Sequence, residues 1–345
     1  MDMPLDQSTP PKRFWRTWRR EIVRGGVLFC LVVGAGLFIS RVHLNVHAPW
    51  GVLGSFGDFD WGGNGEDLFG GTRHIGDPWE FRSPVKPSQH VWIRNTNGPI
   101  NVVAGSGDTL EVHAEKSWRN SSPGSVEVVA VPTERGVTIC AMWEARERRC
   151  GDGGDYRLNG VHKNDVAVRF TVELPRGVPI EASTVNGPLE IDGVSAPVEA
   201  NTVNGRILVN TAVGPIKATT INGSIEAVMQ ALSGGDVELT TVNGSVTAAV
   251  PPNLNATVNA ETVNGRVETD FAVKITGKAS TRHVRGTIGT GVGGGGPTLR
   301  LSTVNGSITL REASPDGPGH PVIAPFTTRS TRRVRIQRPA VPPRP

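Results

Sequence analysis

Apolar and polar residues alternate along most of the chain between residues 89 and 311. The runs Leu189-Glu190-Ile191 and Ile225-Glu226-Ala227 show the pattern, with a charged residue between two aliphatic ones. A period of two places successive side chains on opposite faces of a β-strand. Helical periodicity is missing from the sequence after the first fifty residues. The pattern therefore predicts an all-β protein built from short strands that each bury one face.

An Asn-Gly pair separates these runs at nearly constant intervals. After residue 180 the intervals are 18, 18, 21, 21, 21 and 20 residues, when Arg285-Gly286 is counted as a degenerate copy. One isolated copy lies near the start of the array. Such a period is typical of a repeat architecture, and it predicts about eight coils. The predicted turn residues are Asn97, Gly98, Asn186, Gly187, Asn204, Gly205, Asn222, Gly223, Asn243, Gly244, Asn264, Gly265, Asn305 and Gly306.

The positions around each Asn form columns that stay apolar from copy to copy. Around Asn204 they are Val198 and Ala200 before the turn, and Ile207 and Val209 after it. Stacked coils explain this constancy, because they place equivalent side chains above one another in one interior. Asn-Gly is also typical of a β-hairpin with a type I′ turn, so an antiparallel meander is the alternative. We favour a single-stranded β-solenoid, or β-helix.

The turn residues have a physical reason in a solenoid. Gly accepts a positive φ and Asn tolerates the left-handed region, so we expect the pair to form a tight corner. Stacked Asn side chains would also form a ladder of amide hydrogen bonds along the corners. The outward columns mostly avoid stacked like charges, with Glu181 beside Glu199 as the exception.

An apolar segment at residues 25–41 follows a leader, residues 1–24, that contains six Lys or Arg against three Asp or Glu. The positive-inside rule predicts a cytoplasmic N-terminus and a single-pass helix that anchors the rest outside the cytoplasm. We therefore place the chain at the cell membrane, with its body periplasmic or extracellular. A cleavable signal peptide is the close alternative, because Val46-His47-Ala48 supplies small residues of the kind found at cleavage sites.

The remaining regions differ in composition. Residues 42–88 are rich in Gly and aromatic residues and are expected to form a tether. Residues 89–179 would contain the first coil and a β-rich region that caps the solenoid, and residues 180–311 would contain the other repeats. Residues 312–345 are rich in Pro and Arg, and we expect this tail to be disordered.

Cys140 and Cys150 lie ten residues apart. In an exported protein this pair is expected to form a local disulfide. A metal site is the weaker alternative, because no CxxC spacing occurs and only His162 is near. We expect no metal and no cofactor.

A catalytic β-helix would need paired carboxylates. Glu190 and Glu226 fall on one outward column two coils apart, but a solvated charged face explains them better, and we name no catalytic residue. The most accessible surface is expected around Glu190, Arg206, Glu226, Arg266 and Glu268, which we treat as a possible binding face. The repeats have almost no aromatic residues for base stacking, so we expect no nucleic-acid partner.

The repeats STVNGPLEI, NTVNGRILV, TTINGSIEA, TTVNGSVTA, ETVNGRVET and STVNGSITL follow the lead-in VRFTVELPRGVPIEAS. This series resembles the DUF4097 family of candidate adhesins, over roughly residues 90–311. The resemblance implies a β-helical domain outside the cytoplasmic membrane, and it supplies no catalytic residues. The sequence departs from the pattern at Arg285-Gly286 and at the glycine run 291–296, so the sixth coil is expected to be irregular or looped out.

Together these features predict a membrane-anchored, exported and non-catalytic β-solenoid with a structural or adhesive role at the cell envelope. Its partners would be the membrane, through the N-terminal segment, and an envelope polymer or surface protein. An accessory protein for envelope stress or signalling is the first alternative. A β-helical enzyme that acts on polysaccharides is the second.

Overall fold

The computed structural model describes the backbone of residues 42–45, and residues 73–160, 164–211, 214–232, 235–276, 280–289 and 296–313. Almost all regular structure in these residues is β, which agrees with the predicted class. Within these ranges no helix is long and apolar enough to cross a membrane. The anchor expected at residues 25–41 and the tail beyond residue 313 lie outside the described residues.

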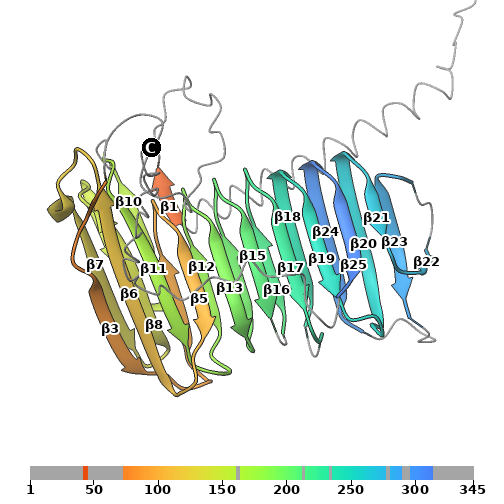
Figure 1. Cartoon of the computed structure of the whole chain (residues 1–345), viewed down its shortest axis with the longest axis horizontal. Helices are drawn as coiled ribbons and strands as arrows, with labels where there is room; N and C mark the ends of the chain where they lie inside the picture. Colours follow the sequence, from red (N-terminus) through yellow and green to blue (C-terminus); the bar gives the residue numbers. More distant parts are fainter. Residues whose placement is uncertain are drawn as a thin grey trace, which may run out of the picture. The chain divides into compact units, whose positions relative to one another are not determined.

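Two long sheets contain most of the strands (Figure 1). Sheet 1 consists, in spatial order, of β2 (His74–Ile75), β6 (Thr109–Trp118), β11 (Ala167–Leu174), β5 (Ile100–Ala104), β13 (Leu189–Val194), β15 (Ile207–Thr211), β17 (Ile225–Met229), β19 (Val246–Val250), β25 (Ile308–Glu312) and β21 (Val267–Thr269), and β3 (Trp79–Pro84) also pairs with β6. Sheet 2 consists of β7 (Val126–Thr133), β8 (Gly136–Trp143), β4 (His90–Arg94), β12 (Ile180–Ser183), β14 (Val198–Asn201), β16 (Ile216–Thr219), β18 (Val237–Asn243), β24 (Thr298–Asn305), β20 (Ala256–Asn264), β23 (His283–Ile288) and β22 (Val273–Ile275).

Each coil contributes one strand to sheet 2, turns at its Asn-Gly corner, and contributes the next strand to sheet 1. We name each coil after its corner asparagine. Neighbouring coils pair in parallel and in the predicted register, as in Ile180 with Val198 on sheet 2 and Leu189 with Ile207 on sheet 1. The antiparallel meander is therefore excluded for these repeats, because a hairpin would pair its two strands with each other.

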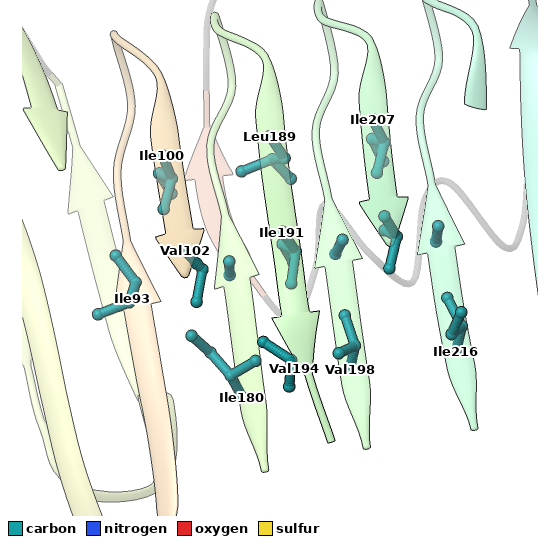
Figure 2. Close-up of a cluster of buried hydrophobic side chains, with 14 of the residues drawn as sticks. Ile93, Ile100, Val102, Ile180, Leu189, Ile191, Val194, Val198, Ile207 and Ile216 are labelled. Carbon is teal, nitrogen blue, oxygen red and sulfur yellow. The ribbon is translucent and has the colours of Figure 1, made fainter. Parts of the chain in front are cut away.

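The apolar columns meet between the two sheets in one continuous core (Figure 2). Ile180, Leu189, Ile207 and Ile216 are all at most 1% exposed. Burying a side chain of this size contributes roughly 1.5–3 kcal/mol, so each coil gains mainly by stacking on its neighbours.

The order of the coils departs from the order of the sequence at the C-terminal end. The Asn305 coil, which is last in the chain, lies between the Asn243 and Asn264 coils (Figure 1). Its Leu299 pairs with Val237 on one side and with Val258 on the other. The last two coils therefore do not stack in sequence order.

The degenerate copy at Arg285-Gly286 forms no coil, so the described residues contain seven Asn-Gly coils and the expected eighth is absent from them. Arg285 lies in β23, which runs antiparallel to β20 and pairs on its other edge with β22. A Cβ at Gly286 would lie 2.4 Å from the carbonyl oxygen of Lys274. Gly286 therefore allows β22 and β23 to approach each other closely. The hairpin of these two strands covers part of the Asn264 coil.

The opposite end of the stack has a different cover. β8 and β11 extend the two sheets in parallel beyond the Asn97 coil, and β7 and β6 then run antiparallel to them. Residues 74–84, which the sequence analysis included in the tether, form β2 and β3 on the edge of sheet 1. The aromatic side chains of Trp79 and Phe81 pack against the core, and this packing explains why the segment is a strand.

Candidate functional site

An asparagine ladder follows the corners of six coils. In each bond the side-chain Nδ2 of one asparagine donates to the Oδ1 of the asparagine in the neighbouring coil, at 2.8 Å. The donor and acceptor pairs are Asn204 to Asn186, Asn222 to Asn204, Asn243 to Asn222, Asn305 to Asn243, and Asn264 to Asn305. The first coil differs, since Asn97 donates to the carbonyl oxygen of Val166. The ladder was predicted, but its final order was not.

The threonine two residues before each asparagine forms a second ladder inside the corner. Its hydroxyl donates to a glycine carbonyl of the neighbouring coil, at 2.8–3.1 Å. The threonines are buried and comprise Thr184, Thr202, Thr220, Thr241, Thr262 and Thr303. The sequence analysis missed this role. The available signal was the presence of Thr at the same position in every one of these copies.

Close packing, more than backbone conformation, explains the corner glycines. A Cβ at Gly205, Gly223 or Gly244 would lie 2.0–2.1 Å from the carbonyl oxygen of the preceding corner glycine. None of these three has a positive φ, whereas Gly98 has a φ of 123°. The expectation that Gly is needed here for its φ is therefore wrong for these corners. A side chain would force neighbouring coils apart.

The expected binding face is distributed along the outer side of sheet 1. Glu190 and Glu226 flank Leu208 on one outward column, as predicted from their two-coil separation. Glu268 lies three strands beyond Glu226, because Thr247 and Thr309 come between them. The five residues therefore do not form one cluster.

The charges on this face are paired. Arg206 lies 3.1 Å from Glu190, and Arg266 lies 3.7 Å from Glu268. Glu226 is paired with Arg311 at 2.7 Å, a partner that the sequence analysis missed. Arg311 reaches Glu226 because the inserted Asn305 coil brings β25 within two strands of β17. Exposed pairs of this kind contribute about 0–1 kcal/mol each, and they leave little unbalanced charge on the face.

On the outer side of sheet 2, cations offset the one expected repulsion between stacked carboxylates. Glu181 lies beside Glu199, but Arg94 pairs with Glu181 at 2.8 Å and Lys217 pairs with Glu199 at 3.1 Å. Arg94 is buried, and it also donates to the carbonyl oxygen of Gly154 and to the hydroxyl of Ser183. Each carboxylate therefore has its own cation.

Cys140 and Cys150 form a disulfide, with their Cα atoms 6.1 Å apart. The bond joins β8 to sheet 3, which consists of β1 (Val42–Asn45), β10 (Tyr156–Asn159) and β9 (Glu147–Cys150). The Tyr156 hydroxyl donates to the carbonyl oxygen of Ala141 at 2.7 Å, and burial raises the pKa of this phenol. No group of His, Cys, Asp or Glu suited to a metal ion occurs in the described part of the chain.

These features define the class: a β-solenoid with parallel coils, internal Asn and Thr ladders, and a β-rich cover at each end. Residues 152–311 match the model of the family described as Toastrack DUF4097. No curated protein is significantly similar to this chain in sequence.

Several crystal structures are similar to the chain. A candidate cell adhesion protein from Clostridium sporogenes has 11% identity and a TM-score of 0.40, with 68% of this chain and 100% of that chain covered. A candidate adhesin from Bacteroides fragilis has 13% identity and a TM-score of 0.33, with 68% and 97% covered. A candidate adhesin from Parabacteroides merdae has 12% identity and a TM-score of 0.20, with 69% and 97% covered.

Proposed function

We propose that this protein is an exported structural or adhesive module, held at the cell membrane by residues 25–41, that presents its solenoid to an envelope polymer or a surface protein. The proposed role is non-catalytic. The observation that carries it is the saturated, repeating surface: the corner amides bond to one another, and the charges on the outer faces form pairs. Such a surface is rigid and periodic, which suits contact with an extended partner.

The disulfide supports the proposed location. Disulfides persist in oxidising compartments and are rare in the cytosol of most organisms. Cys140 and Cys150 join two β elements, so their bond holds part of the folded body. A body that folds outside the cytoplasm accounts for this bond.

The charge distribution suggests which part would contact an anionic partner. Residues 314–345 contain six Arg and one Asp, whereas the whole chain has a formal net charge of only +4. The rest of the chain is therefore close to neutral. We propose that the Arg-rich tail supplies the electrostatic attraction to anionic envelope polymer or lipid, and that the solenoid supplies the rigid spacing.

Retention of the full-length, detergent-solubilised protein on insoluble cell-wall material tests the binding role. A variant with all six tail arginines changed to Gln is compared with a control variant, R82Q/E111Q, that removes one surface pair away from the possible binding face. We expect retention that declines with salt, is largely lost in the tail variant and survives in the control. Equal retention of the tail variant would contradict the role of the tail. Absence of retention for the unmodified protein would contradict the adhesive role.

Protease accessibility tests the location separately. Intact cells with a permeable outer surface are treated with protease, and the solenoid is followed with an antibody. Cleavage outside, with a cytoplasmic marker left intact, is expected. Protection of the solenoid until the cells are lysed would contradict export.

A further inference from the structure

Asn-Gly pairs can react spontaneously. The backbone nitrogen of Gly attacks the Asn side-chain carbon Cγ, and ammonia leaves as a cyclic succinimide forms. Water then opens the ring to aspartate or isoaspartate. The reaction needs a Gly N–H that is free of its hydrogen bond and a carboxamide that can rotate. The seven corner pairs share this chemistry, so their contacts decide which of them reacts.

At the interior corners, hydrogen bonds hold both the Gly N–H and the Asn carboxamide. Gly205, Gly223 and Gly244 each donate their N–H to the corner asparagine carbonyl of the next coil, at 3.0 Å. The carboxamides of Asn204, Asn222 and Asn243 each donate one ladder bond and accept another. Reaction at these corners requires at least two hydrogen bonds to open together.

The corner pair Asn264-Gly265 lacks most of this protection. It belongs to the coil at the end of the stack, since the last coil in sequence is inserted before it. In the described ranges the Gly265 N–H makes no hydrogen bond, and the Asn264 Oδ1 accepts none. One bond remains, from Asn264 Nδ2 to Asn305 at 2.8 Å. Both residues are exposed to the water that must open the ring.

The antiparallel cover contacts the chain on both sides of this corner, where the Thr262 N–H donates to the Arg282 carbonyl oxygen and the Val267 N–H donates to that of Thr281. The pairing of β23 with β20 runs only from Ala256 to Glu261 along β20. Asn264 and Gly265 lie beyond the last paired residue. Both corner residues are nevertheless exposed, and the described residues of the hairpin form no hydrogen bond with them.

We propose that Asn264 is a modification site, at which the folded protein converts asparagine to aspartate or isoaspartate while the other ladder asparagines are protected. The carboxylate product has lost the donor of the bond to Asn305. The isoaspartate product also adds a methylene to the backbone of the end coil, which breaks its register with β24. The modification would thus loosen the Asn264 coil at the end of the stack and leave the interior coils intact.

A pair outside the coils gives a comparison. Asn159-Gly160 lies in sheet 3, where Asn159 Nδ2 donates to Glu147 Oε2 at 2.7 Å and Asn159 Oδ1 is buried without a partner. The carboxamide is held there by a carboxylate, and its oxygen is buried. We expect this pair to react more slowly than Asn264.

The test is incubation of the full-length folded protein in mildly alkaline buffer, followed by peptide mapping with mass spectrometry. Asn264 should be modified at least about tenfold faster than Asn222 and Asn243, because each of those must first open its hydrogen bonds. In denaturant, the same three pairs should react at similar rates. Equal rates in the folded protein, or a preference for Asn264 that persists in denaturant, would overturn the inference.

The variant N305A leaves Asn243 with its donated bond to Asn222 and with the Gly244 N–H bond, whereas Asn264 keeps neither kind of contact. It removes ladder bonds from both Asn264 and Asn243, but the Gly244 N–H can still donate to the backbone carbonyl of residue 305. We expect Asn243 to remain slower than Asn264. Reaction of Asn243 as fast as Asn264 in this folded variant would overturn the protection assigned to these two remaining contacts.

Discussion

The coils from Asn186 to Asn243 and the two coils that follow them have the same repeat but different topology. The first four stack in sequence order. The last two exchange places, so that the Asn305 coil occupies an interior position and the Asn264 coil an end. The comparison shows that a repeat determines which residues face inward but leaves the order of the coils open, because every coil offers the same columns to its neighbours.

Contacts outside the columns favour the inserted position. Arg300 lies beside Glu238 in the sheet, and the Asp236 carboxylate accepts a hydrogen bond from the Thr298 backbone N–H at 2.9 Å. Arg311 reaches Glu226. In sequence order the Asn305 coil would lie next to the Asn264 coil only, and these contacts with the Asn222 and Asn243 coils would be lost.

The largest expected effect comes from Gly244→Ala in the interior of the stack. The new Cβ would lie 2.0 Å from the carbonyl oxygen of Gly223, between two coils that cannot both move. We expect a loss of at least about 4 kcal/mol in the free energy of unfolding. Gly265→Ala has a similar clash with Gly306, but the end coil can move away, so its loss should be smaller. Denaturant unfolding of both variants measures the difference, and equal losses would contradict the assigned coil order.

Leu301→Ala tests whether the inserted coil supports both neighbours. Leu301 is 1% exposed and pairs with Leu239 on one side and Ala260 on the other. The cavity should lower the free energy of unfolding by about 3 kcal/mol. Hydrogen exchange should increase in β20 as well as in β24. Faster exchange confined to β24 would mean that the Asn264 coil does not depend on the inserted one.

Replacing both Cys140 and Cys150 with Ala tests the opposite end. The disulfide joins two cysteines that are ten residues apart in the sequence. Its loss should lower the free energy of unfolding by about 2 kcal/mol. Exchange should increase in β8, β9 and β10, with the Asn243, Asn305 and Asn264 coils unchanged. Reducing agent should have the same effect on the unmodified protein and none on the variant. A uniform increase in hydrogen exchange along the whole stack of coils would show that its two ends are coupled.

Arg300→Glu is the smallest and sharpest test of the coil order. It places a second carboxylate beside Glu238, and we expect a loss of about 1 kcal/mol or less. In an E238Q background the same change should cost less, because the facing carboxylate is gone. Equal losses in the two backgrounds at low salt would contradict the adjacency of β18 and β24.

Much of the core and the corner could be predicted from the sequence, because both depend on local periodicity. The apolar columns followed from alternation, and the asparagine ladder followed from the register that those columns require. Arg311 could not be predicted as the partner of Glu226, since the two residues are 85 positions apart. The strands β2 and β3 were also missed, because their short alternation lies in a segment rich in Gly and aromatic residues.

By itself the sequence determined the all-β class, the coil register, the buried columns and the asparagine corners, since each of these repeats at a short interval. The tertiary structure alone decided the order of the last two coils, the antiparallel role of Arg285-Gly286 and the pairing of charges across the outer faces. The physical reason is that coils with equivalent interiors stack equally well in several orders. Only contacts between distant segments distinguish one order from another.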